Sequence, residues 1–521
     1  MSDPAAATQP SRTARFLHNV MWSWVGVVVN ILLGLFVSPI LVRRLGEMQY
    51  GVWVIVFSTM DYLRLLDFGL RAAVINRSAR HQARRDWVGV NETIATAMVY
   101  FLLMSAICCA VAVFGRDAAM SLFKIDPAFH DDARLLLVII AASISARLIF
   151  SPVTAALEVF QRFDLINRAY IGNLTVRAVG SLALLLGGYG LVPLGWLVLA
   201  VAVGEDVWNL VSLKRVFPEL RLSPRLVRRE AFAELVGYGK HSSMMTVANM
   251  VELQAPSTVL GMMRGPTEVA FFALPWRLLM YTTEAFAKVG QITASMTAEL
   301  DEARDSRRVW TVAVTTNRMC LALFMPLAIF LCVYATPFLS VWVTPEMGRN
   351  SGPLLPVLVV PFLFAIAGQF NSGSVLMGQA RHRVYAWSIV VEVIVMAAGL
   401  FLVAPRYGAY GVAWVVSMSI TAVRGAFLAV LMCRVNGFAL ADYLRAIYLR
   451  PLLTGAPVLA LAAAMRLTVL PGTNWPELIA AGALVAIAYF AIAFFSVLDG
   501  GSRGQIMMRI PGSQRLFSKF A

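Results

Sequence analysis

Charged residues are scarce in this sequence of 521 residues, at 14% of the chain, against about 25% in soluble proteins. Hydrophobic residues make up 59%. A water-soluble core cannot bury this much apolar sequence, so the composition excludes a soluble globular protein. Apolar windows of about 20 residues, the length that crosses a bilayer, recur from Val20 to Leu498.

Motifs for nucleotide and metal chemistry are absent as well. The sequence has no GxxxxGK[ST] phosphate loop, no HExxH and no clustered acidic metal motif. The connections predicted to face outward have about 20 residues or fewer, too few for a separate catalytic domain. We therefore expect no enzymatic activity, no metal site and no cofactor.

Cysteine is rare too, with 5 residues that all lie in or beside apolar windows. None has metal-ligand spacing with histidine, so we interpret them as small apolar packing residues rather than disulfides. They are Cys108, Cys109, Cys320, Cys332 and Cys433.

Apolar windows predict an all-α polytopic membrane protein of about fourteen transmembrane helices. The first window follows Arg12 and Arg15 and lacks a cleavage site, so we expect a helix that is retained rather than a signal peptide. The ninth is longer than a span requires, which predicts a tilt or an interfacial segment. The windows are 20–42, 50–70, 91–114, 134–156, 168–188, 191–213, 235–260, 267–291, 310–342, 353–377, 384–404, 408–432, 448–468 and 475–497.

Positive charge gathers in alternate connections. Residues 71–90, 214–234 and 379–383 and the C-terminal tail are rich in arginine, whereas residues 115–133 are rich in aspartate. The positive-inside rule then predicts that both termini are cytoplasmic. The net charge of +15 fits this rule and attraction to anionic membrane lipids, so we expect no nucleic-acid partner.

Landmarks recur at a nearly constant distance and predict an internal duplication. Gly190 and Gly408 each follow a tyrosine, and their positions differ by 218; Gln161 and Gln379 share this offset. Gly46 and Gly265 differ by 219, as do Asn30 and Asn249. The predicted parts are a cytoplasmic tail 1–19, an N-lobe 20–213, a basic cytoplasmic linker 214–234, a C-lobe 235–432, an appended helix pair 448–497 and a basic cytoplasmic tail 498–521. The two six-helix lobes are expected to be pseudo-symmetric.

Charged residues within the second window are the first candidates for function, because a charge at mid-bilayer costs about 2.5–3.5 kcal/mol on insertion scales. Arg64, Asp67 and Arg71 are spaced by three and four residues, which places them on one face of an α-helix. Two interpretations remain open. One is a polar stripe of net charge +1 lining a cavity. The other is an intrahelical ion pair, with Arg71 at the cytoplasmic end.

The seventh and eighth windows also carry charge. In the eighth, Glu284 and Lys288 could neutralise each other and leave Arg277 for an anion, or Lys288 could extend to the interface. In the seventh, His241 and Glu252 share a face, but a lone membrane histidine is more often a packing residue than a proton relay.

The remaining charged positions are isolated. Asp206 aligns with Arg424 at an offset of 218, and a salt bridge between the lobes is one explanation. Arginine binds phosphate through two parallel hydrogen bonds and stays charged, so scattered arginines favour an anionic group in a partly wet cavity. The candidate substrate-binding residues are Arg64, Asp67, Arg71, Arg277, Arg147, Arg177, Arg318 and Arg424. The candidate coupling residues are Asp206, Glu252, Glu284 and Lys288. Aromatic residues that could stack on sugars, or simply face lipid, are Trp22, Trp24, Tyr62, Trp276, Tyr281 and Trp414.

Several segments carry a family resemblance. They are the stretch Leu45-Gly46-Glu47-Met48-Gln49-Tyr50-Gly51-Val52-Trp53, continuing through Tyr62, Leu65, Asp67, Phe68, Gly69 and Leu70, and the segments 161–168 and 407–414. Through them the sequence resembles, over nearly its whole length, the polysaccharide-transporter branch of the multidrug/oligosaccharidyl-lipid/polysaccharide (MOP) exporter superfamily. Within that branch it looks like the O-antigen-unit flippases.

The resemblance implies a secondary transporter in the bacterial inner membrane. It would flip a polyprenyl-pyrophosphate-linked oligosaccharide, an O-antigen or exopolysaccharide repeat unit, by alternating access. Coupling to a proton or sodium gradient, contact with membrane lipids and association with other polysaccharide-assembly proteins are compatible with it. The alternatives are a MATE-like drug/cation antiporter, which should favour carboxylates over arginines, a lipid II flippase, a membrane glycosyltransferase or polymerase, and a non-transporting scaffold.

Overall fold

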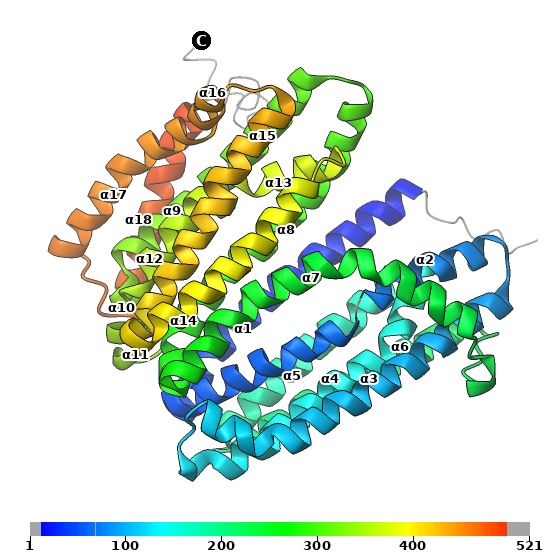
Figure 1. The fold of residues 1–521 in the computed structure, drawn as a ribbon. Coiled ribbons are helices and arrows are strands. Elements are labelled where there is room, and N and C mark those ends of the chain that lie inside the picture. Colours follow the sequence, from blue (N-terminus) through cyan, green and yellow to red (C-terminus); the bar gives the residue numbers. More distant parts are fainter. Residues whose placement is uncertain (1–11, 68, 498–521) are drawn as a thin grey trace, which may run out of the picture. The chain divides into compact units, whose positions relative to one another are not determined.

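The computed structural model describes the backbone of residues 12–67 and 69–497, and their side chains except those of residues 12–25 and 237–246. Within these residues the chain is helical and contains no strand, which confirms the all-α prediction (Figure 1). Except at their ends, helices satisfy their backbone hydrogen bonds internally, as a chain surrounded by lipid requires. Residues 1–11 of the predicted N-terminal tail and the predicted tail 498–521 lie outside the described residues.

The α-helices are α1 (Arg12–Asp61), α2 (Leu70–Ala83), α3 (Trp87–Leu122), α4 (His130–Val159), α5 (Phe163–Leu186), α6 (Leu191–Val216), α7 (Arg229–Arg264), α8 (Pro266–Glu302), α9 (Ser306–Val333), α10 (Ala335–Trp342), α11 (Pro345–Ser351), α12 (Leu354–Pro361), α13 (Gly368–Gly378), α14 (Arg383–Ile420), α15 (Leu428–Asn436), α16 (Leu440–Leu444), α17 (Arg450–Thr468) and α18 (Trp475–Ser496). Short 3-10 segments are η1 (Tyr62–Asp67), η2 (Pro127–Phe129) and η3 (Pro224–Leu226). Three π-helical segments are η4 (Phe362–Ala367), η5 (Thr421–Phe427) and η6 (Arg445–Leu449).

Ten helical segments among the described residues are long and apolar enough to cross a membrane, so the protein is a multi-pass membrane protein. Two of them, of 58 and 54 residues, are each long enough for two crossings. A glycine with positive φ divides each: Gly46 (φ 78°) within α1 and Gly408 (φ 55°) within α14. Dividing both segments and adding the more charged α7 and α8, of 36 and 37 residues, would give the predicted fourteen, and that number stays a prediction.

The ninth predicted window holds two helices. α9 ends at Val333 and α10 begins at Ala335, with a non-helical Tyr334 between them. A separate short helix therefore accounts for the excess length of the window.

The helices form two compact units, residues 1–273 with 397–412, and residues 274–396 with 413–521. In the first unit α3 packs on α4, α4 on α6, α5 on α1 and α6, and α2 on α3, α4 and α7. A buried cluster of α3, α4 and α6 side chains, including Ile94, Leu157 and Leu213, forms part of its core. The predicted lobes 20–213 and 235–432 stay a prediction, because packing within each unit does not decide where a duplication begins.

The second unit is built around α9, which packs on α13, α17, α18, η4 and η6. Its interior holds a buried polar network. The Asn317 amide donates to the Ser372 hydroxyl (2.9 Å) and to the Tyr443 hydroxyl (3.2 Å), while its carbonyl accepts from the backbone N–H of Asn371 (3.0 Å). Such satisfied polar groups fix a helix register at a site where an unpaired group would be costly.

Turn geometry recurs along the chain at the predicted distance. Arg85 and Arg304 both have φ of 54°, and they precede Asp86 and Asp305, which cap α3 and α9 through their side chains. These residues are 219 positions apart, like Gly46 and Gly265, which also have positive φ. The same local structure at the same offset supports an internal duplication.

One pair of landmarks is shifted. The left-handed residue after α4 is Gln161 (φ 56°), and the left-handed residue after α13 is Ala380 (φ 55°), again 219 positions apart. The predicted equivalence of Gln161 with Gln379 is therefore wrong by one residue. The hydrogen bonds that close a turn, rather than side-chain identity, define equivalent positions.

Candidate functional site: the interrupted second span

The second predicted span is not one continuous α-helix. α1 ends at Asp61, η1 follows as a tighter 3-10 turn, and α2 begins at Leu70 after Gly69, whose φ is 73°. Glycine adopts this left-handed conformation without the clash that a Cβ atom would cause. Interrupted membrane helices expose backbone groups and are a recurring place for substrate sites in transporters.

The interruption overturns one prediction. Arg64, Asp67 and Arg71 do not share one α-helical face, because Arg64 and Asp67 lie in the 3-10 turn and Gly69 separates them from Arg71. Asp67 instead provides a hydrogen-bond acceptor for the first turn of α2. Its Oδ1 accepts a hydrogen bond from the backbone N–H of Arg71 at 3.1 Å. This interaction replaces an intrahelical bond that the start of a helix lacks.

Asp61 and Arg64 form a local pair at this interruption. Arg64 Nη1 lies 3.7 Å from Asp61 Oδ1, and the Arg64 side chain is 49% exposed. Asp61 Oδ2 also accepts a hydrogen bond from Gln254 Nε2 on α7 at 3.1 Å. The separation and exposure describe a loose ion pair, of a kind that contributes little stability and exchanges partners easily.

Arg71 is held more firmly. Its Nη2 lies 2.5 Å from Glu158 Oε1 on α4, and its Nη1 lies 3.5 Å from the carbonyl oxygen of Ser151. The Tyr100 hydroxyl on α3 donates to the carbonyl of Leu66 at 3.0 Å, close to the break. Side chains from α3, α4 and α7 therefore hold the interrupted segment.

The charge of this cluster differs from the prediction. The spacing of Arg64, Asp67 and Arg71 predicts a stripe of two arginines and one aspartate, with net charge +1. The structure adds the carboxylates of Asp61 and Glu158, so two arginines face three acids and the fully ionised cluster carries a net charge of −1. An anion would compete with a carboxylate at each arginine, and Arg64 is the easier of the two to release.

A second paired arginine of the first unit is Arg147, which is as exposed as Arg71. Arg147 Nη2 on α4 lies 2.7 Å from Glu205 Oε2 on α6, and Asn173 Nδ2 donates to the same oxygen at 2.7 Å. Asp206, one residue along α6, is buried. Arg177, on α5, is half-buried.

Arg277 lies on α8 in the second unit. Its Nε donates to the Tyr281 hydroxyl at 3.0 Å, and its guanidinium lies 5.8 Å from the centre of that ring. Tyr281 therefore orients Arg277. Trp276 is buried and packs edge-on against Phe362, with ring centres 5.9 Å apart, so its stacking on a sugar is not supported. Tyr62 is half-buried and Trp414 exposed.

The other arginines of this unit are more enclosed. Arg424 lies on η5, and its Nε is 3.6 Å from Glu392 Oε2 on α14. Glu392 neutralises Arg424 within the same unit, so a salt bridge to Asp206 is not needed for that purpose. Arg318, on α9, is buried.

The predicted coupling residues are dispersed. Asp206 is on α6, Glu252 is half-buried on α7, and Glu284 and Lys288 lie one turn apart on α8. Their coupling role stays a prediction, as does the substrate-binding role of the arginines. The side chains of His241, Trp22 and Trp24 lie outside the described residues.

The sequence analysis does not predict which carboxylates pair with these arginines. Asp61 could have been found, because it lies three residues before Arg64. Glu158 is 87 residues from Arg71 and Glu205 is 58 from Arg147, so local spacing gives no signal of either contact.

Residues 16–293 match the model of a protein family described as "Polysaccharide biosynthesis protein". The chain is also 21% identical over 514 residues to the "Uncharacterized membrane protein EpsK" of Bacillus subtilis (strain 168), with 95% of this chain and 98% of that protein covered.

Solved structures with the same fold include two kinds of transporter. The lipid II flippase MurJ, in an inward closed conformation, matches with a TM-score of 0.73 and 13% identity, covering 92% of this chain and 100% of that one. An inward-facing multidrug resistance MATE family transporter of the MOP superfamily matches with a TM-score of 0.66 and 13% identity, covering 81% and 98%. At these identities the likeness shows the fold alone.

Proposed function

Since the chain belongs to the polysaccharide biosynthesis protein family, we propose that this membrane transporter of the MOP fold flips a polyprenyl-pyrophosphate-linked oligosaccharide across the bacterial inner membrane. The cargo would be an O-antigen or exopolysaccharide repeat unit, moved by alternating access. The family, the length of the match to EpsK and the fold support this proposal.

The interrupted second span is the observation that carries the proposal. Its arginines, Arg64 and Arg71, suit the two phosphates of a pyrophosphate, because a guanidinium donates paired hydrogen bonds to phosphate oxygens. The carboxylates of Asp61 and Glu158, once released, can accept hydrogen bonds from sugar hydroxyls. Both chemical parts of a lipid-linked sugar phosphate thus have partners within one cluster.

A drug/cation antiporter is the second candidate, and the net charge of −1 at the interruption favours it. The coverage favours a flippase: the MATE structure matches 81% of this chain, whereas the lipid II flippase matches 92%. A lipid II flippase is itself an alternative within the same class of cargo.

Leaflet accessibility of the cargo in proteoliposomes tests the proposal. Purified protein would be reconstituted with a fluorescent polyprenyl-pyrophosphate oligosaccharide, with lipid II and a cationic dye in parallel vesicles. Movement of the oligosaccharide without the dye supports the proposal. Movement of lipid II alone or of the dye alone assigns the protein to the corresponding alternative, and glycan elongation would indicate a polymerase.

Coupling and cellular context complete the proposal. We propose that a proton or sodium gradient drives transport and that no other cofactor takes part. Contacts would be made with membrane lipids and with other polysaccharide-assembly proteins. We propose no enzymatic activity, since transport requires none.

A further inference from the structure

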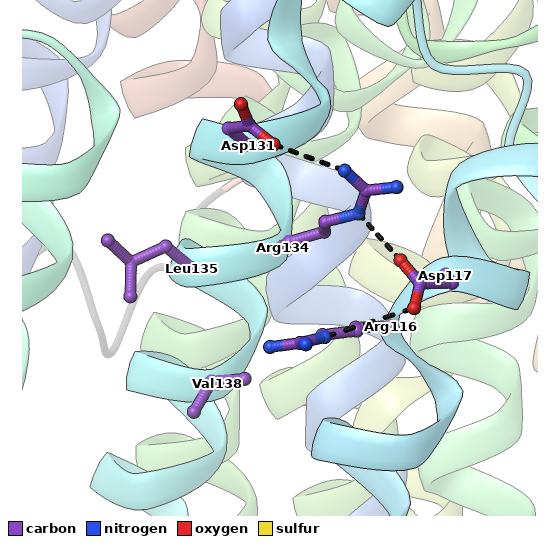
Figure 2. Close-up of a pocket in the computed structure, with 6 residues that line it drawn as sticks. All are labelled: Arg116, Asp117, Asp131, Arg134, Leu135 and Val138. Carbon is purple, nitrogen blue, oxygen red and sulfur yellow. Dashed lines mark hydrogen bonds and ion pairs between the residues drawn. The ribbon is translucent and has the colours of Figure 1, made fainter.

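A hollow lies between the end of α3 and the start of α4, in the first unit. Its space is about 530 Å³, within the range of about 300–1,000 Å³ that is usual for small-molecule sites. Figure 2 shows its lining, with Arg134 held between two aspartates. The lining residues are Arg116, Asp117, Asp131, Arg134, Leu135 and Val138.

The charged groups of the hollow alternate in sign. Arg134 Nε lies 2.7 Å from Asp117 Oδ1, and Arg134 Nη1 lies 3.1 Å from Asp131 Oδ1 (Figure 2). Arg116 Nε is 4.0 Å from Asp117 Oδ2, the limit of an ion pair. Two arginines and two aspartates give no net charge, and all four are accessible to a ligand, since each is at least one third exposed.

An apolar stripe leads to this hollow along α3. Leu103, Ile107, Val111 and Phe114 are spaced by four, four and three residues and are all exposed, with Phe114 at 85%. Such a stripe on a membrane helix faces lipid. It ends at Phe114, two residues before Arg116, while Leu135 and Val138 add apolar lining on α4. The charged hollow therefore lies at the depth where acyl chains end and headgroups begin.

The balance of charge selects among headgroups. A headgroup that carries only negative charge would pair with the two arginines. The same negative charge would lie beside the two aspartate carboxylates and be repelled by them. A primary ammonium donates three N–H bonds to carboxylates, whereas a quaternary ammonium donates none. A phosphate next to a primary ammonium matches the arginines and the aspartates together.

We propose that this hollow binds the headgroup of a diacyl phospholipid that carries both a phosphate and a primary ammonium. Arg116 and Arg134 bind the phosphate, Asp117 and Asp131 bind the ammonium, and the stripe on α3 contacts the acyl chains. This site is independent of the proposed cargo, because its ligand is a lipid of the surrounding bilayer.

Lipid retention measured by native mass spectrometry tests the proposal. The full-length protein would be released from nanodiscs containing equal parts of phosphatidylethanolamine, phosphatidylglycerol and phosphatidylcholine. We expect phosphatidylethanolamine to be retained about fivefold over each of the others, a ratio that one exposed charge pair can supply.

Asp117→Asn and Arg134→Gln should each remove this preference. Asp132→Asn is the matched control, because Asp132 is exposed next to Asp131 but does not line the hollow. Equal retention of phosphatidylglycerol by the unmodified protein would overturn the proposal in favour of a plain anion site. An unchanged lipid preference in Asp117→Asn would overturn the proposal as well, and so would the same loss of preference in Asp132→Asn. If a variant does not fold, the retention of the three lipids by the unmodified protein still tests the proposal.

Discussion

Three arginines in the described helices are each paired with a carboxylate of the same unit. Arg71 with Glu158 and Arg147 with Glu205 join different helices, and Arg424 with Glu392 joins η5 to α14. A neutral pair costs far less in lipid than a lone charge. Removing one partner is therefore more harmful than exchanging both.

The pair of Arg71 and Glu158 gives the first prediction. Arg71→Ala and Glu158→Ala should each lower the free energy of unfolding by about 2 kcal/mol, the value of a hydrogen bond between charged groups. The exchanged variant Arg71→Glu with Glu158→Arg should recover thermal stability but not glycolipid transport, since the arginine proposed to bind phosphate has moved. Thermal unfolding and proteoliposome transport measure the two effects, and an exchanged variant as unstable as the single ones would contradict the pairing.

The two exposed candidate arginines, Arg64 and Arg277, give the second prediction. Arg64→Ala and Arg277→Ala should each lower transport about tenfold, equivalent to about 1.4 kcal/mol of lost binding, with expression and membrane insertion unchanged. Arg349→Ala, at an exposed position of α11 outside the cluster, is the control. If both variants transport at the normal rate, the anion-binding role of these arginines is wrong.

Among the elements, α3 and α9 begin with the same aspartate cap. The pKa of Asp86 is held below its ordinary value by the backbone N–H of Gly89 and then by the side chain of His81. A carboxyl whose pKa is lower in the folded state stabilises the fold above its unfolded pKa of about 3.9 and loses that effect as the pH falls toward the folded value.

The third prediction follows from this cap. Asp86→Ala should lower the free energy of unfolding by about 1 kcal/mol at neutral pH, and Asp305→Ala should do the same for α9. Asp86→Asn keeps a capping oxygen but removes the titration, so its stability should fall less between about pH 5 and pH 3 than that of the unmodified protein. Thermal unfolding at several pH values measures this, and identical pH profiles for the two proteins would contradict it.

Close approach of two elements gives the fourth prediction. A Cβ atom at Gly51 on α1 would collide with the backbone carbonyl of Pro266 at the start of α8, whereas one at Gly115 on α3 would meet open space. Gly51→Ala should therefore cost about 1–3 kcal/mol. Gly115→Ala should be neutral or stabilising by up to about 1 kcal/mol, because alanine favours a helix. The melting temperatures of the two variants measure this difference. Equal values would contradict it, because they would mean that the backbone at Pro266 moves away from Gly51→Ala at no cost in free energy.

For the whole molecule, the distribution of basic connections predicts which segments face the cytoplasm. A cysteine at Asp131 should react with a membrane-impermeant maleimide in intact cells, and a cysteine at Arg225 should react only after the membrane is opened. Both positions are exposed, so the labelling reports their side of the membrane. The five native cysteines would be replaced first. Labelling of Arg225→Cys alone in intact cells would reverse the orientation.

The sequence predicted the fold well and the site in part. Apolar windows gave the helical class, and glycine landmarks marked Gly46 and Gly408, where the long helices divide. Periodicity could not reveal the 3-10 turn before Gly69, because its residues satisfy the spacing of an α-helix equally well. Partners such as Glu158 depend on packing between distant segments, which a single sequence does not encode locally.

Pairing across distant helices also bears on how the protein is made. When the ribosome has just added Arg71 to the chain, its partner Glu158 is still 87 residues from being synthesised. At about 5–20 residues per second this is a delay of roughly 4 to 17 s. During that interval the arginine has no access to that carboxylate, so the early helices must wait beside the insertion machinery, or with their charge in water, until α4 arrives.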